Sequence, residues 1–236
     1  MVITYIYHSC FLVETDGFAM VFDYFRDNGY LEKIIPTLQK PLYVFASHFH
    51  GDHFNAEIFK WKSLSSNIQF ILSKDIFEEG KAEQGDGFFM EKSDIWQDEN
   101  IKVKAYGSTD VGISFYVEAD GFSLFHAGDL NNWHWIDEAE PQESTGYEAD
   151  YHKELAELAE DVKQVDIAMF PVDKRLETDY YKGAREFVEK IETGLFIPMH
   201  FGKDYASANA FGEVAKKYCK GFFVISKKNE KLEWGK

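Results

Sequence analysis

Short hydrophobic runs dominate the first quarter of the chain and predict a series of β-strands. The runs VITYIY, CFLVET and FAMVFD lie at residues 2–7, 10–15 and 18–23. The last two are separated by Asp16-Gly17, and such a pair between apolar runs is a strong hairpin signal. The continuous apolar run LYVFAS, at residues 42–47, predicts a buried strand.

The middle of the chain continues this pattern, and the last third changes it. Strand-like runs occur at residues 67–73, 87–93 and 101–107, and a second hairpin is predicted about Asp120-Gly121. Apolar residues then recur at helical spacing near residues 150–162, 182–191 and 207–218. Strands are predicted at residues 166–172, 194–200 and 221–226. The stretch 131–150 shows no clear period and is predicted to be a loop.

The two predicted hairpins have similar sequences. FLVETDGF begins at Phe11 and FYVEADGF begins at Phe115, and six of the eight positions are identical at a constant offset of 104. Chance, shared hairpin chemistry or a structural repeat could each produce this match. A repeat would give two β-rich halves with helices outside, and two such halves face to face make a four-layer αββα sandwich. No linker of Pro, Ser and Gly separates the halves, so a single domain over residues 1–236 is predicted.

Composition limits the classes of function. The formal net charge is −16, and an acidic surface repels phosphate backbones, so nucleic acid is not an expected partner. No apolar run is long enough to span a membrane, and no signal peptide is evident, so no membrane partner is expected. Cys10 and Cys219 form no CxxC pair, which makes the cytoplasm the expected location.

The run SHFHGDHF, which directly follows the predicted buried strand at residues 42–47, carries the candidate chemistry. It contains His48, His50, Asp52 and His53, which include three of the eight histidines of the chain. In an extended loop alternate side chains point the same way, and Gly51 allows the bend that brings in the last histidine. Imidazole and carboxylate suit Zn, Mn or Fe. A structural zinc site would more typically use cysteines, and none is nearby.

His-x-His-x-Asp-His after a buried strand resembles the signature of the metallo-β-lactamase superfamily. The resemblance implies an α/β (α+β) fold, a four-layer αββα sandwich of two mixed sheets face to face with helices outside. It extends to HAGD, which makes Asp129 the metal-bridging carboxylate, and to IPMHF, which makes His200 a ligand. Asp23 then lies behind the metal loop. The opening YHSCFLVETDGF, residues 7–18, resembles the branch that includes ascorbate-6-phosphate lactonase.

The resemblance also implies how the ligands divide. His48 and His50 belong to a first metal position, the second takes Asp52, His53 and His200, and Asp129 bridges the two. The family usually supplies a third histidine to the first position, but no histidine lies between His53 and His126. Three alternatives remain open: Asp110 replaces it and favours Mn or Fe, His134 reaches in from the loop, or the first position is weak and the protein is mononuclear.

Further residues are candidates for the substrate and for the surroundings of the metal. His8 at the end of the first strand is a candidate substrate contact, and His134 is another. Lys174 and Arg175 follow a predicted strand and could attract a phosphate or carboxylate in an acidic protein. His126 is a candidate partner of the ligands, and Asp52 could also orient the reacting water.

We therefore expect a metal-dependent hydrolase with one or two divalent ions, zinc first and manganese or iron as alternatives. The resemblance implies a metal-bound hydroxide that attacks a small, anionic ester, lactone or phosphodiester. Two other functions stay open: a non-hydrolytic member with di-iron redox chemistry, and a degenerate member that only binds.

Overall fold

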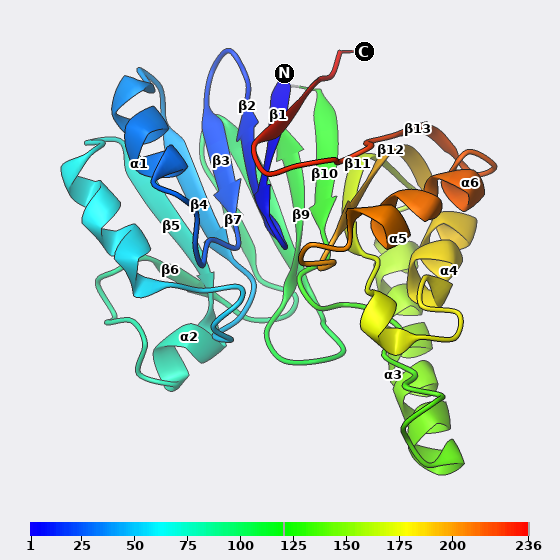
Figure 1. Ribbon diagram of the computed structural model, residues 1–236. Helices are drawn as coiled ribbons and strands as arrows, with labels where there is room; N and C mark the ends of the chain where they lie inside the picture. Colours follow the sequence, from blue (N-terminus) through cyan, green and yellow to red (C-terminus); the bar gives the residue numbers. More distant parts are fainter. Residues whose placement is uncertain (120, 236) are drawn as a thin grey trace. The chain divides into compact units, whose positions relative to one another are not determined.

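Each of two units of the chain is built around one mixed β-sheet (Figure 1). The computed structural model describes residues 1–119 and 121–235. Unit 1 comprises residues 1–91 and 226–236, and unit 2 comprises residues 92–225. The predicted turn at Asp120-Gly121 includes Asp120, which lies outside the described residues.

The sheet of unit 1 has seven strands among the described residues, in the order β14-β1-β2-β3-β4-β5-β6. Antiparallel pairing joins β14, β1, β2 and β3, and parallel pairing joins β3, β4, β5 and β6. The strands are β1 (Val2–Tyr7), β2 (Cys10–Glu14), β3 (Ala19–Phe22), β4 (Leu42–Ala46), β5 (Ile68–Ser73), β6 (Phe88–Met90) and β14 (Glu230–Glu233).

Short helices complete the core of unit 1. They are α1 (Tyr30–Ile34), η1 (Ile35–Thr37), η2 (Ala56–Ser63) and α2 (Lys74–Glu78). One buried cluster joins strand residues such as Leu12 and Val44 to the helix residues Leu31, Ile58 and Trp61. Because alternate strand residues share a face, one face of this sheet packs against the helices. This packing supports the loops that follow β3 and β4.

The sheet of unit 2 also has seven strands among the described residues, in the order β13-β12-β11-β10-β9-β8-β7. Antiparallel pairing joins β7, β8, β9 and β10, and parallel pairing joins β10, β11, β12 and β13. The strands are β7 (Ile95–Gln97), β8 (Ile101–Tyr106), β9 (Ser114–Ala119), β10 (Phe122–His126), β11 (Gln164–Pro171), β12 (Glu192–Met199) and β13 (Cys219–Phe222).

Helices connect the parallel strands of unit 2, as parallel pairing requires. They are α3 (Pro141–Asp161), η3 (Lys174–Leu176), α4 (Lys182–Lys190), α5 (Tyr205–Ala210) and α6 (Gly212–Ala215). The ring of Phe187 on α4 stacks on Phe125 and also contacts Phe170, with centroids 5.5 and 4.7 Å away. These contacts bind α4 to the strands that carry the candidate site.

Two predictions for unit 2 were wrong in detail. The predicted loop at 131–150 ends early, because α3 begins at Pro141. Proline suits the first turn of a helix, but the first half of α3 is mostly exposed and polar, so no apolar period marks it. The single helix predicted near 207–218 forms as α5 and α6 instead.

The two sheets have the same topology. In each, four strands pair antiparallel and the last of them begins a run of parallel strands, so β1–β6 correspond to β8–β13 and β14 corresponds to β7. The similar sequences at residues 11–18 and 115–122 therefore occupy equivalent hairpins, β2–β3 and β9–β10. This correspondence supports the structural repeat over a chance match.

The candidate site residues follow strands that end at a common edge of their sheet. In unit 1, β1, β3 and β4 run in one direction and lead to His8, Asp23 and His48. In unit 2, β10, β11 and β12 run in one direction and lead to Asp129, Asp173 and His200.

Backbone strain marks three of these strand ends. His8, Asp23 and His200 have φ angles of 59°, 45° and 63°. Side chains other than glycine rarely adopt this left-handed region, at a cost of about 1–3 kcal/mol each, and such residues concentrate at functional sites. The strained backbone at these three positions sets the direction of the candidate side chains, and the folded chain tolerates its energetic cost there.

Candidate metal centre

The bend at residues 48–53 gathers the imidazoles of unit 1. The amides of His53 and Phe54 both donate to the carbonyl of His50, over 3.0 and 2.9 Å, which closes the chain into a tight turn. The ring of His48 lies 4.1 Å from that of His53 and 4.8 Å from that of His50, between centroids. His48 and His53 are fully buried.

Asp23 holds this bend from behind. One carboxylate oxygen accepts the Ser47 amide at 2.7 Å, and the other accepts the Ser47 hydroxyl at 2.7 Å and His53 Nδ1 at 2.7 Å. A carboxylate only accepts here, so Nδ1 of His53 carries the proton and Nε2 keeps its lone pair. Asp23 therefore orients His53 with Nε2, the nitrogen that could bind a metal, directed away from the carboxylate.

The hydroxyl of Ser47 extends this arrangement to His48. The hydroxyl oxygen lies 2.9 Å from His48 Nδ1. Because its single proton goes to Asp23, the oxygen must accept the proton of Nδ1, which again leaves the lone pair on Nε2. A buried partner that fixes the tautomer of a histidine is the usual arrangement behind a metal ligand.

In unit 2, Asp129 and His200 lie together. Oδ1 of Asp129 is 3.4 Å from Nε2 of His200, and both side chains are nearly fully buried. Nδ1 of His200 lies 2.8 Å from Oδ2 of Asp173, so this ring is fixed as those of His48 and His53 are. Burial opposes ionisation of Asp173, but the hydrogen bonds from His200 and Arg175 outweigh it and hold the pKa of Asp173 well below its ordinary range.

Arg175 and Lys174 lie beside this group and face solvent. The Arg175 guanidinium binds Asp173 through Nε and one terminal nitrogen, at 2.9 and 2.5 Å. The same terminal nitrogen is 3.3 Å from Nδ1 of His200, while 62% of the side chain is exposed. Lys174 is exposed and lies over the ring of Tyr180, 4.9 Å from its centroid. A positive group is thus available next to a predicted ligand.

Asp110 lies in the loop that follows β8. One ligand atom of Asp110 and one of Asp129 lie within 4.8 Å of each other. Thr109 holds this loop in place, because its hydroxyl accepts the amide of Asn131 at 2.9 Å and donates to the carbonyl of Asn131 at 2.6 Å. Asp129 therefore lies near both a carboxylate, that of Asp110, and the imidazole of His200.

Two other histidines of unit 2 make structural contacts. Nδ1 of His134 accepts the amide of Ile136 at 3.2 Å, so its Nε2 donates to the carbonyl of Asp179 at 3.4 Å. These bonds engage both ring nitrogens and favour a structural role for His134. His126 is fully buried, and its Nδ1 accepts the amide of Gly128 at 3.2 Å, one residue before Asp129.

Three residues position the site in ways that sequence reasoning did not assign. Ser47 and Asp173 are buried and orient His48 and His200, and both follow buried strands, which is the one signal that could have indicated them. The indole of Trp133 donates to the carbonyl of Asp129 at 2.8 Å and contacts the edge of the His200 ring, with centroids 5.4 Å apart.

The donor set fits a divalent metal. Imidazole nitrogens and carboxylate oxygens suit Zn, Mn or Fe. In unit 1 His48 and His53, and in unit 2 His200, each have Nδ1 bonded to a buried oxygen, which is typical of a histidine that binds metal through Nε2. Two ligands of a tetrahedral ion at about 2.1 Å lie roughly 3.4 Å apart, which matches the 3.4 Å between Asp129 and His200.

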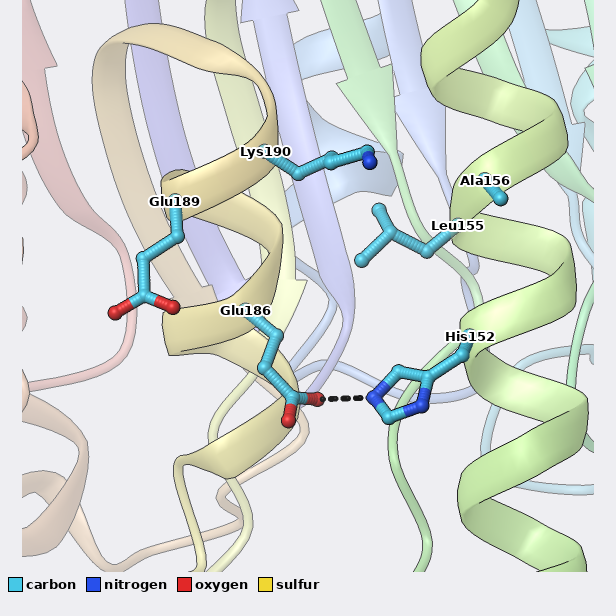
Figure 2. A pocket seen from close by; sticks show the side chains of 6 residues that line it. All are labelled: His152, Leu155, Ala156, Glu186, Glu189 and Lys190. Carbon is cyan, nitrogen blue, oxygen red and sulfur yellow. Dashed lines mark ion pairs between the residues drawn. The ribbon is translucent and has the colours of Figure 1, made fainter.

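A hollow of about 320 Å³ lies between α3 and α4 (Figure 2). Nε2 of His152 lies 3.3 Å from the carboxylate of Glu186 there, and half of the histidine side chain is exposed. This hollow contains none of the predicted ligands. Its lining residues are His152, Leu155, Ala156, Glu186, Glu189 and Lys190.

Within the described residues, none of the helices combines the length and apolar character that a membrane span requires.

Known proteins resemble this chain in sequence and in fold. A family model described as a beta-lactamase superfamily domain matches residues 2–144. A UPF0173 metal-dependent hydrolase of Methanopyrus kandleri is 27% identical over 218 residues, which cover 86% of this chain and 84% of the relative.

Among solved structures, a novel metallo hydrolase of Ignicoccus hospitalis superposes with a TM-score of 0.66 at 16% identity over the full length of both chains. CmlA, a diiron beta-hydroxylase of Streptomyces venezuelae, gives a TM-score of 0.66 at 12% identity over 99% of this chain and 54% of that one. The resemblance to the ascorbate-6-phosphate lactonase branch is not confirmed by these matches and stays a prediction. The chain belongs to the beta-lactamase superfamily and has the metallo-β-lactamase fold that its motif predicted.

Proposed function

We propose that this protein is a metal-dependent hydrolase that acts on a small anionic ester, lactone or phosphodiester. The observation that carries the proposal is the common anchoring of His48, His53 and His200, each through Nδ1 to a buried oxygen. Such anchoring is typical of histidines that bind a metal. The relative from Methanopyrus kandleri, named a metal-dependent hydrolase, supports the same function.

The predicted ligands are grouped within each unit. Those of unit 1 are His48, His50, Asp52 and His53, and those of unit 2 are Asp129 and His200, with Asp110 as an additional carboxylate. The nearness of Asp129 to both Asp110 and His200 supports its role as the bridging ligand. Zinc is the first candidate metal, and an added carboxylate would favour manganese or iron.

A bound divalent ion would supply Lewis-acid chemistry, by polarising a substrate oxygen and lowering the pKa of water. The protein's own groups do the rest. Asp52, with about half of its side chain exposed, can accept a hydrogen bond from water and orient it. Arg175 can bind an anionic group of the substrate, because its guanidinium is held by Asp173 while most of the side chain stays exposed to solvent.

The test is metal analysis combined with turnover of chromogenic substrates, one ester, one lactone and one phosphodiester. His50→Ala should abolish metal-dependent turnover while the fold stays intact. His152→Ala, on α3, is the matched control and should keep both metal and activity. If His50→Ala retains full activity on a substrate that the wild type hydrolyses, the proposal is wrong.

One observation favours a second function. The carboxylates of Asp110 and Asp129 lie near each other, and an oxygen-rich ligand set suits iron. The likeness of the fold to CmlA, a diiron hydroxylase, is compatible with redox chemistry but shows the fold alone. Stoichiometric iron with a visible absorption band would favour this function, and zinc or manganese with hydrolysis would favour the first.

A further inference from the structure

His8 lies in a conformation that its surroundings impose. It follows β1 directly, where the pairing with β2 shifts register between Tyr5 and Tyr7. Its φ of 59° is in the left-handed region, and its amide donates to the hydroxyl of Tyr5 at 2.9 Å. Glycine or asparagine would adopt this backbone more easily. Because the backbone does not favour histidine at this position, the reason for this residue should lie in the role of its imidazole.

The imidazole of His8 faces the second predicted metal position. Nε2 lies 3.5 Å from Oδ2 of Asp52, and the ring meets that of His53 edge-on, with centroids 5.8 Å apart. One ligand atom from each of these three residues lies within 4.8 Å of the others. All three residues belong to unit 1, so this grouping is a property of one unit.

Aromatic rings restrict the motion of the imidazole. Phe25 contacts it edge-on at 6.0 Å, and Tyr7 lies 6.2 Å away, between centroids. Only 11% of the His8 side chain is exposed. A group enclosed in this way has little freedom to adapt to a substrate, whereas a metal ligand gains from being fixed.

We propose that His8 is a metal ligand and completes a set of three from unit 1 together with Asp52 and His53. The inference rests on the proposed function, because it concerns the same metal centre. The separation of 3.5 Å between His8 and Asp52 matches the edge of roughly 3.4 Å between two ligands at about 2.1 Å from one ion. Through Nε2, His8 contributes a neutral imidazole beside the carboxylate.

The experiment measures metal binding rather than turnover. His8→Gly and His8→Asn remove the imidazole and suit the left-handed backbone, so both should fold. Circular dichroism and thermal unfolding of the metal-free variants check this. The dissociation constants for Co²⁺ and Zn²⁺, from chelator competition, should rise by more than about 100-fold, which exceeds the loss expected from removing a group behind a ligand.

A spectroscopic readout separates a ligand from a neighbour. The visible spectrum of the Co²⁺ form should change, and X-ray absorption should count one fewer histidine ligand in His8→Gly than in the wild type. His152→Ala is the control and should bind and absorb as the wild type does. If folded His8→Gly and His8→Asn keep the wild-type affinity and spectrum, His8 is no ligand, although the proposed function survives. A wild-type protein that takes up no metal overturns both proposals.

Discussion

Nδ1 of His53 lies 2.7 Å from Oδ2 of Asp23, and neither side chain is exposed to solvent. The same carboxylate receives both the amide and the hydroxyl of Ser47. One buried carboxylate thereby orients two imidazoles, His53 directly and His48 through the serine. The bend at residues 48–53 is thus shaped by a residue that lies 30 positions from His53 in sequence.

Asp23→Asn should weaken metal binding. Oδ1 of Asp23 accepts the Ser47 amide, and Oδ2 accepts protons from the Ser47 hydroxyl and His53. In asparagine an NH₂ group replaces one of these oxygens and faces a donor from which it cannot accept a hydrogen bond. We expect the metal dissociation constant to rise about 10–100-fold and the free energy of unfolding of the metal-free protein to fall by about 1–3 kcal/mol. Chelator competition and urea unfolding measure the two.

The control for Asp23→Asn is Asp137→Asn. Asp137 also accepts two hydrogen bonds, both from Thr178, but it is exposed. This change should leave metal affinity as it is and alter stability by less than about 0.5 kcal/mol. Equal metal affinities of Asp23→Asn and the wild type would contradict the role given to Asp23.

Substitutions of Asp110 should change which metal the protein prefers. Carboxylates suit manganese, and imidazole suits zinc. Asp110→His should therefore raise the ratio of Zn²⁺ to Mn²⁺ affinity roughly tenfold, and Asp110→Ala should weaken binding of both ions. Isothermal titration with each ion is the measurement. Asp150→Ala, an exposed substitution on α3, is the control; an unchanged ratio in Asp110→His would show that Asp110 does not touch the metal.

Both thiols should react slowly in the folded protein. Burial raises the pKa of Cys10 well above its ordinary value of 9.0, with smaller contributions from Asp23 and Asp27, and burial raises that of Cys219 to about 12. At pH 8 a disulfide reagent should modify both thiols rapidly in urea and slowly without it. Rapid modification of the folded protein would contradict this.

The same thiols link stability to alkaline pH. Because their pKa values are higher in the folded state, the unfolded state loses these protons first as pH rises. The contribution of the thiols to the free energy of unfolding is complete below pH 9. It declines as pH rises from there toward the pKa values of the thiols in the folded state. The Cys10→Ala and Cys219→Ala variants should show a weaker decline of unfolding free energy in this range.

Two glycine substitutions should have opposite effects. A Cβ on Gly183 would lie 2.1 Å from the side-chain oxygen of Asn131 and 2.7 Å from the amide of Asn132, whereas one on Gly146 meets nothing within 4 Å. Gly183→Ala should cost about 1–3 kcal/mol, since the loop after Asp129 must move. Gly146→Ala in the exposed part of α3 should stabilise by about 0.5–1 kcal/mol. Thermal and urea unfolding compare them, and equal stabilities would contradict the packing described.

Sequence patterns predicted the elements whose side chains are buried and periodic. The runs that became β1, β4 and β11 are apolar because both faces of these strands are covered. β7 and β14 were missed because they are short, largely exposed strands at the edges of their sheets, so apolar pattern is weak there. Pairing with a neighbour, which sequence periodicity does not report, makes them strands.

Sequence likewise indicated some of the candidate site residues and not others. His48, His50, Asp52 and His53 could be identified because their spacing is rare and they follow a buried strand. Ser47 and Asp173 are common residue types whose importance arises from hydrogen bonds to a histidine and to a second charged side chain. No spacing rule predicts these arrangements, since the Asp23 partner of Ser47 and the His200 partner of Asp173 follow other strands.

Pairing of β14 with β1 has a consequence for biosynthesis. Residues 226–236 belong to unit 1, and β14 covers the outer edge of β1, with further bonds from Asn229 to Tyr5 and from Trp234 to Met1. While the ribosome is still producing the middle of the chain, that edge stays open to other nascent polypeptides. Once residues 226–236 have been synthesised, β14 pairs with β1 and closes this edge of the strand that leads to His8. Truncation before residue 226 would leave the edge open and should promote aggregation of newly made protein.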